Sequence, residues 1–159
     1  MKPLKLYILI LSFSGLFLSC KKNAEINTPI PDAVYITSTA VTGSGASAST
    51  TITNAASGKI SVSPASARVY VNTPKTADIS VSYTLGGTAI AGTNYTLPSV
   101  QSIIIPAGKW YADINISVIN SPLSANRTII INLSSASNNL QLGLGSDKTY
   151  KSFTYTLTN

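Results

Sequence analysis

The sequence predicts an all-β fold, an antiparallel β-sandwich of about seven to eight strands. Apolar and polar residues alternate with a period of two through the stretch from Ile79 to Val118, and turns at Gly86-Gly87 and Pro106 to Lys109 interrupt it. This alternation is typical of strands that bury one face. No helical period of ten residues occurs after the first twenty positions, and turn signals recur about every dozen residues, as in sandwiches.

The expected strands follow one another along the chain from residue 33. They contain Val34 and Ile36, Ile60 and Val62, Val69 and Val71, Ile79 to Leu85, Ile103 to Ile105, Ala112 to Val118, Ile129 to Leu133, Leu140 to Leu144, and Phe153 to Leu157, with a short segment at 50–53 and loops at 42–49 and 134–139. We expect the strand with Ile114, Ile116 and Val118 to be central and to neighbour the strand with Ile129 and Ile131.

The first twenty residues read as an export signal. Lys2 and Lys5 precede an apolar run, 6–18, which is shorter than the roughly 20 residues that a membrane span needs. The segment Phe17-Leu18-Ser19-Cys20 resembles the lipobox of bacterial lipoproteins. That resemblance implies a lipid thioether at Cys20; the alternative is an incidental cysteine in an ordinary secretory signal.

Three segments follow from this interpretation. Residues 1–19 are the lipoprotein signal peptide, 20–32 the lipidated anchor and tether, and 33–159 the sandwich domain. Pro29 and Pro31 favour an extended tether. We expect the protein to be anchored by lipid to the outer membrane of a bacterial cell envelope, and the choice between its surface and periplasmic leaflets stays open.

The charge pattern favours an exported protein and disfavours nucleic acid as a partner. Charged residues make up 10% of the chain, against about a quarter in ordinary soluble domains. The formal net charge is +6, but the Lys and Arg residues that follow the tether are scattered singly along the chain. Nucleic-acid binding requires a basic cluster and a matching fold.

The acidic residues do not form a catalytic pattern. The chain has no histidine, and beyond the tether only Asp78, Asp113 and Asp147 are acidic. General acid/base catalysis needs paired titratable groups, and a serine nucleophile needs a base. Solvated caps, turns and a polar strand face explain these three positions, so we expect no enzyme and no cofactor.

Five short motifs, in this order and spacing, resemble the Calx-beta motif. They are Val81-Ser82-Tyr83-Thr84, Gly87-Thr88-Ala89, Gly92-Thr93-Asn94-Tyr95, Ile105-Pro106-Ala107-Gly108 and Ile114-Asn115-Ile116-Ser117-Val118. They equally resemble the immunoglobulin-like N-terminal domains of starch-utilisation-type, polysaccharide-uptake outer-membrane lipoproteins. The resemblance covers roughly the last hundred residues and implies an immunoglobulin-like β-sandwich used for adhesion or binding.

The same resemblance raises the question of calcium, and this sequence departs from the family there. Asn94 stands at the family's acidic position, and the turn after Val118 carries Asn120, Ser121 and Asn126. Calcium prefers several carboxylates among its six to eight oxygen ligands. Neutral amides supply no charge, so we expect no calcium site and no other metal.

Aromatic residues are the candidates for ligand binding. Trp110, Tyr111 and Tyr150 lie near expected loops, where an exposed ring could stack on a sugar. Trp110 shares parity with Ala112 and Ile114 and is expected over the edge of the core, whereas Tyr111 is expected to face water. Packing at the core or its rim is the alternative role for all three.

Two functions remain open from the sequence. The first is a non-catalytic, lipid-anchored binding or spacer module associated with surface glycan binding or uptake. The second is a structural, adhesion or protein-interaction module of the outer membrane that has no glycan ligand and docks a membrane or secreted partner through a sheet edge or loops.

Overall fold

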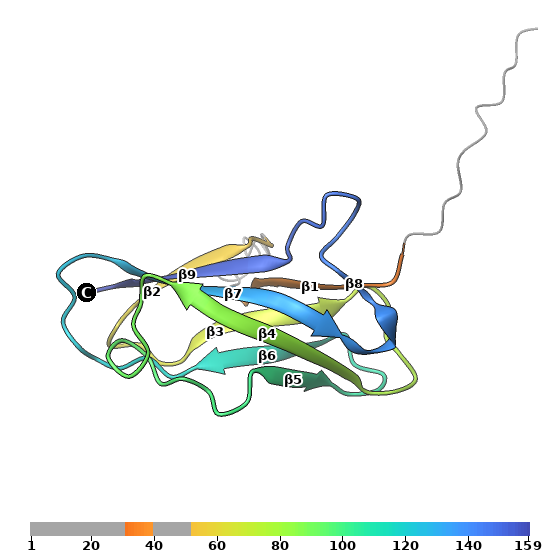
Figure 1. The fold of residues 1–159 in the computed structure, drawn as a ribbon, viewed down its shortest axis with the longest axis horizontal. Coiled ribbons are helices and arrows are strands. Elements are labelled where there is room, and N and C mark those ends of the chain that lie inside the picture. Colours follow the sequence, from red (N-terminus) through yellow and green to blue (C-terminus); the bar gives the residue numbers. More distant parts are fainter. Residues whose placement is uncertain (1–30, 40–51) are drawn as a thin grey trace, which may run out of the picture.

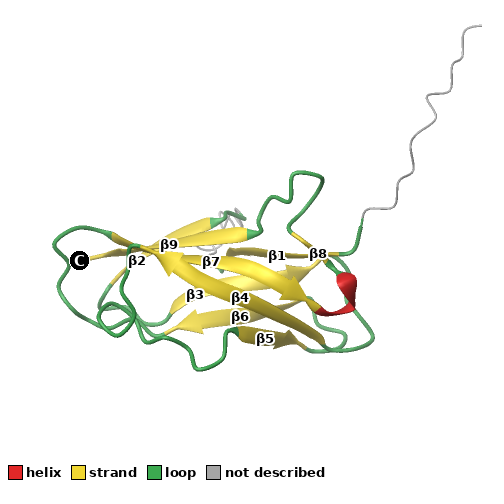
Figure 2. Ribbon diagram, viewed as in Figure 1, coloured by secondary structure: helices red, strands yellow, loops and turns green. Residues whose placement is uncertain are grey.

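The computed structural model describes residues 31–39 and 52–159, which form two packed β-sheets (Figures 1 and 2). The expectations for the signal peptide, Cys20, the tether up to residue 30 and the loop at 42–49 lie outside the described residues. The strands are β1 (Ala33–Ser38), β2 (Ala55–Lys59), β3 (Ala65–Val71), β4 (Ile79–Gly87), β5 (Ser102–Ile105), β6 (Tyr111–Ile116), β7 (Arg127–Ala136), β8 (Gln141–Leu142) and β9 (Ser152–Thr158), with a short 3₁₀ helix, η3 (Ser137–Asn139), between β7 and β8.

The two sheets divide the strands four and five. One sheet has the order β6-β3-β1-β8 and the other has the order β2-β9-β7-β4-β5. The sandwich predicted from the alternating pattern is therefore confirmed, and it is an immunoglobulin-like β-sandwich. Two neighbouring pairs, β1 with β8 and β2 with β9, are parallel, so the sheets are not purely antiparallel as expected.

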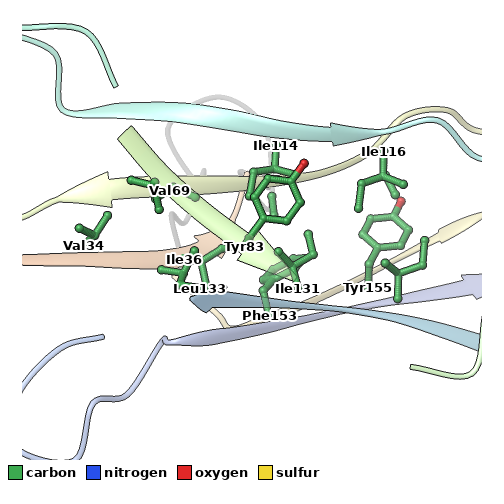
Figure 3. Close-up of a cluster of buried hydrophobic side chains, with 14 of the residues drawn as sticks. Val34, Ile36, Val69, Tyr83, Ile114, Ile116, Ile131, Leu133, Phe153 and Tyr155 are labelled. Atoms are coloured by element: carbon green, nitrogen blue, oxygen red, sulfur yellow. The ribbon is translucent and has the colours of Figure 1, made fainter. Parts of the chain in front are cut away.

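The core lies between the sheets and is built from the predicted alternate residues. Phe153, Tyr155 and Leu157 of β9 point inward beside Ile129, Ile131 and Leu133 of β7, and all six are at most 8% exposed. Figure 3 shows several of them meeting Ile114 and Ile116 from the opposite sheet. The chain has one cysteine, so it cannot form an internal disulfide. Burial of these apolar side chains is therefore the main source of stability.

The position of β6 in its sheet differs from the prediction. We expected the strand with Ile114 and Ile116 to be central and beside the strand with Ile129, but among the described strands β6 is at the edge of its sheet and pairs with β3. Ile114 and Ile116 are still only 1% and 0% exposed. The five-stranded sheet packs over that face, so burial here comes from the facing sheet and not from a central position.

The second strand also differs from the prediction. We expected a strand with Ile60 and Val62, but these residues lie in a turn, and Val62 is 56% exposed. The strand β2 precedes them and contains Ala-Ala-Ser-Gly-Lys, which has low intrinsic strand propensity. Its pairing with β9 explains why it is extended, since tertiary pairing overrides local preference.

Two smaller expectations also need correction. The segment at 134–139 was expected to be a polar loop, but β7 continues to Ala136 before η3. Of the expected strand from Leu140 to Leu144, only Gln141–Leu142 pairs as a strand. Within the described ranges, no helix is long and apolar enough to cross a membrane.

Candidate functional site

Three tyrosines form a row across the outer face of the four-stranded sheet. The register places Tyr35 of β1 opposite Tyr70 of β3, and Tyr70 opposite Tyr111 of β6. The rings of Tyr35 and Tyr70 are stacked with centroids 5.5 Å apart, and the rings of Tyr70 and Tyr111 lie 5.5 Å apart at an interplanar angle of 56°. We call these three residues the tyrosine row. Such ring pairs stabilise a sheet by more than the apolar area that they bury.

An ion pair occupies the next row of the same face. Arg68 donates from Nε to Oδ1 of Asp113 at 2.7 Å and from Nη2 to Oδ2 at 2.9 Å. The hydrogen bonds to Asp113 raise the pKa of Arg68 above its ordinary value, so the guanidinium stays charged. Asp113 is therefore a paired side chain and not simply a solvated residue of a polar face, as the sequence led us to expect.

The ion pair supports the ring of Tyr111. The guanidinium carbon of Arg68 lies 3.8 Å from the centroid of that ring, in the range of a cation–π contact. Because Asp113 holds the guanidinium plane by two hydrogen bonds, the ring rests on a fixed support. Tyr111 is nevertheless 44% exposed, so a substantial part of it faces solvent, as its parity predicted.

Polar groups continue this face beyond the ion pair. Ser66 of β3 lies opposite Asn115 of β6, and its hydroxyl donates to Oδ1 of Asn115 at 2.7 Å. At the other side of the row, burial and the neighbouring Tyr70 raise the pKa of the Tyr35 phenol. The candidate site is thus a partly exposed aromatic ring in contact with an ion pair that has no net charge, with a serine and an asparagine beyond that ion pair.

The three aromatic residues singled out from the sequence do not form one surface. Trp110 lies at a bend just before β6, outside the strand that carries Tyr111. Tyr150 lies near the opposite edge of the sheet, beside β1, where its carbonyl oxygen accepts a hydrogen bond from the amide of Ile36 at 2.8 Å. Since strands are about 4.8 Å apart, Tyr150 and Tyr111 are separated by roughly 14 Å across the sheet.

The placement of Trp110 also differs from the expectation that it covers the edge of the core. Its side chain is 54% exposed. It has the parity of the buried Ile114, but it lies at a bend just before β6 and is not part of the strand.

The acidic residues of the described ranges lie apart from one another. Asp32 pairs with Lys75 at 2.6 Å, Asp78 accepts the amide of Ala107 at 2.9 Å, and Asp147 accepts the hydroxyl of Ser146 at 3.3 Å. Within residues 31–39 and 52–159 no three acidic, histidine or cysteine side chains lie together in a way that could hold a metal ion.

Asn94, which stands at the family's acidic position, has a structural role in a turn. It is 6% exposed, and its Oδ1 accepts the amide of Ile90 at 2.8 Å. Its backbone also bonds to the carbonyl of Ile90 and to the amide of Ile119. The side-chain oxygen that could have faced a cation is therefore used to close the loop between β4 and β5.

Sequence reasoning missed the tyrosine row and the Arg68–Asp113 pair, although a signal for both was present. The order Arg68-x-Tyr70 in one strand and Tyr111-x-Asp113 in the other is reciprocal. If two such strands pair antiparallel, tyrosine meets tyrosine and arginine meets aspartate. The pairing of β3 with β6 is not encoded in either strand alone, so the sequence does not bring these residues together.

Comparison with solved structures identifies the fold. The crystal structures of the calcium binding domain CBD12 of CALX1.1 and of CBD12 from CALX1.2 match 65% of this chain, with TM-scores of 0.56 and sequence identities of 20% and 19%. The apo-form Calx CBD1 domain also matches 65% of the chain, with a TM-score of 0.53 and 19% identity. The fold is Calx-beta-like.

These similarities are structural and partial. The matches cover 40% and 41% of the two CBD12 chains and 88% of the CBD1 chain. No protein-family model matches the sequence, and no curated protein matches it either. The Calx-beta-like fold expected from the five sequence motifs is thus confirmed, and the identities of about 20% extend the comparison no further than the fold.

Proposed function

We propose that this protein is a non-catalytic lipoprotein, anchored through Cys20 to the outer membrane of a bacterial cell envelope, whose Calx-beta-like sandwich binds neutral glycans on the face that carries Tyr111. The observation that supports this proposal is the ring of Tyr111, which is 44% exposed and rests on the guanidinium of Arg68. A flat, fixed and partly exposed ring can stack on the apolar face of a pyranose.

The surroundings of the ring favour a neutral ligand. Arg68 and Asp113 are joined by two hydrogen bonds and cancel one another's charge, so the face offers little net attraction to a polyanion. Ser66 and Asn115 follow on the same face and can exchange hydrogen bonds with sugar hydroxyls. Together these groups match the apolar faces and polar rims of an uncharged polysaccharide.

A non-catalytic role agrees with the side-chain chemistry. The sequence has no histidine. In the described part of the chain, Asp32 and Asp113 are each paired with a cation, and Asp78 and Asp147 accept hydrogen bonds in turns. None of these arrangements provides the two cooperating carboxyl groups that hydrolysis of a glycosidic bond requires.

Affinity electrophoresis in native gels tests the glycan proposal. Gels that contain soluble starch, xylan or a neutral β-glucan should retard the wild-type protein in at least one case. Loss of the ring in Tyr111→Ala should weaken retardation about fivefold or more, which corresponds to about 1 kcal/mol of stacking. Tyr111→Phe keeps the ring and should retain binding, and Tyr150→Ala, across the sheet, is the matched control. Unchanged mobility of the wild type in every polysaccharide, or equal retardation of Tyr111→Ala, would contradict the proposal.

A second candidate function is docking of an extended segment of a membrane or secreted protein. The edge strand β5 favours it, because β5 pairs with β4 alone among the described strands, and Ile104 on its outer face is 59% exposed. A charge at this edge blocks strand addition. Ile104→Lys should therefore abolish cross-linking to an envelope partner in cells without changing retardation by polysaccharide. If glycan binding is the function, Tyr111→Ala should reduce retardation and Ile104→Lys should not.

A further inference from the structure

The segment through which the chain enters the sandwich lies at one end of the fold, the right-hand end in Figure 1. The turn from β3 to β4 and the turn from β5 to β6 lie at the same end, and the C-terminus lies at the opposite end. We call this right-hand end the entry end.

The entering chain is held firmly at that end. The side chain of Asn72 donates to the carbonyl of Pro31 at 3.1 Å and accepts the amide of Ala33 at 3.0 Å. Asp32 forms a 2.6 Å ion pair with Lys75, and its carbonyl accepts the amide of Gln141 at 2.9 Å. Contacts from both sides therefore fix residues 31–33 to the sandwich, although the sequence indicated that Pro31 and Asp32 belong to the tether.

The turn between β5 and β6 is joined to the same point. The amide of Gly108 donates to the carbonyl of Lys75 at 2.8 Å, and the amide of Val71 donates to the carbonyl of Trp110 at 2.9 Å. Lys75 also forms the ion pair with Asp32, so this one residue contacts both the turn and the entering chain. The backbone of the turn is therefore tied to the entering chain through Lys75.

This turn exposes a combination of residues that is common at membrane surfaces. Residues 106–110 are all exposed, and Trp110, with 54% exposure, is the largest side chain among them. Lys109 precedes it. Tryptophan prefers the headgroup region of a bilayer, where its ring is apolar and its N–H can bond, and lysine adds attraction to anionic lipid.

The proposed anchor brings this end within reach of the membrane. Cys20 and Pro31 are eleven residues apart, since 31 − 20 = 11. Even a fully extended chain of that length spans only about 36–40 Å. A surface held this close to a bilayer meets it at a high effective concentration, so a weak preference for the interface is enough to populate contact.

We propose that the entry end docks on the lipid headgroups of the membrane that holds Cys20, with Trp110 in the interface and Lys109 against anionic lipid. This proposal rests on the proposed lipid anchor. It is compatible with glycan binding at Tyr111, because Trp110 lies at a bend before β6, whereas Tyr111 belongs to the tyrosine row on the outer face of the sheet. Trp110 then faces the membrane from beyond the end of the sandwich, and Tyr111 faces outward from the sheet.

The sequence allows a direct test, because Trp110 is the single tryptophan and Cys20 the single cysteine. The full chain is attached to vesicles of phosphatidylcholine and phosphatidylglycerol in two ways. In one arm the lipoprotein made by cells is reconstituted; in the other, unlipidated protein is coupled through the thiol of Cys20 to a maleimide phospholipid. Tryptophan fluorescence is then recorded with acrylamide in the water and with brominated lipid in the bilayer.

We expect acrylamide quenching of Trp110 to fall roughly threefold on vesicles, because the interface covers a ring that is otherwise exposed, and brominated lipid to quench it. The control is Trp110→Phe combined with Val62→Trp, which moves the reporter to a residue of similar exposure, 56% against 54%. Val62 lies at the opposite end, since Ile60 beside it bonds to Thr158. This reporter should stay accessible to acrylamide.

Lys109→Gln should weaken docking on anionic vesicles about fivefold, the equivalent of about 1 kcal/mol for one lysine.

The two arms separate this proposal from the anchor on which it rests. If cells do not lipidate Cys20 but the coupled protein docks through Trp110, the anchor is wrong and the docking surface stands. If Trp110 on vesicles is quenched by acrylamide as strongly as in solution, the docking proposal is overturned. Equal shielding of Trp110 and of the reporter at position 62 also overturns it, because the protein then adsorbs to lipid without a preferred end.

Discussion

Arg68 and Asp113 face one another on adjacent strands and are joined by two hydrogen bonds of 2.7 and 2.9 Å, in a bidentate geometry that also places the guanidinium under the ring of Tyr111. The two side chains are 25% and 32% exposed, so water screens the pair only in part. This contact links the stability of the outer sheet face to the orientation of the proposed binding ring.

A double-mutant cycle measures this link. Arg68→Gln and Asp113→Asn should each destabilise the domain, and the double variant should cost less than the sum, with a coupling free energy of about 0.5–1 kcal/mol. Chemical denaturation of the four proteins gives the coupling. Strict additivity of the two free-energy changes would mean that the pair contributes nothing to stability. Ser66→Ala on the same strand face is a control for general effects of the sheet surface.

The register of β6 gives a second prediction. Ile116 is fully buried, whereas Ser117 directly after it is exposed. Ile116→Ala should cost about 2–5 kcal/mol, a large share of the ~5–15 kcal/mol that holds a domain, and Ser117→Ala about 0.5 kcal/mol or less. Denaturation of both variants beside the wild type checks this. A reversed order would show that the strand is shifted by one residue, because such a slip exchanges its faces.

The contact of Gly58 with Tyr155 gives a third prediction. A Cβ at Gly58 would overlap the hydroxyl of the buried Tyr155, whereas a Cβ at Gly86 would meet nothing within 4 Å. Gly58→Ala should destabilise the protein by about 1–3 kcal/mol through overpacking. The same change at Gly86 should be nearly neutral. Removing the hydroxyl with Tyr155→Phe should restore part of the loss in the double variant. If Gly58→Ala and Gly86→Ala melt at the same temperature, the packing of β2 on β9 is not as described.

Calcium gives a fourth prediction, since one structure of similar fold is the calcium binding domain CBD12 of CALX1.1. The Oδ1 of Asn94 already accepts the amide of Ile90. We therefore predict that a chelator leaves the melting temperature of the purified protein unchanged, because a ligand that binds only the native state would raise it. A fall of several degrees with chelator that added calcium reverses would reveal a site that these residues were not expected to form.

The sequence predicted the burial pattern well because that pattern is local. The alternation through Ile114 and Ile116, and through Phe153 and Leu157, marks the buried face of each strand whatever its neighbours are. The place of a strand in its sheet is not local. The sequence of β6 is apolar enough for a central strand, and its position at an edge is visible only once its pairing with β3 is known.

The candidate site was predictable in part for the same reason. The exposure of Tyr111 follows from its parity with Asp113, and the structure agrees. The support that Arg68 provides depends on which strands pair. The sequence did not predict β2, because its residues have low strand propensity. Gly58 fits there because it leaves room for the hydroxyl of Tyr155, about a hundred residues further along the chain.

The attachment of lipid to Cys20 is the central claim of the account, because the proposed location at the cell envelope depends on it. Metabolic labelling with a fatty-acid probe, followed by separation of membrane and soluble fractions, tests it most directly. The account predicts that the wild-type protein is labelled and sediments with the membrane, because two or three acyl chains give stable anchorage. Cys20→Ala should carry no label and should leave the membrane fraction. Unlabelled wild-type protein in the soluble fraction would contradict the account.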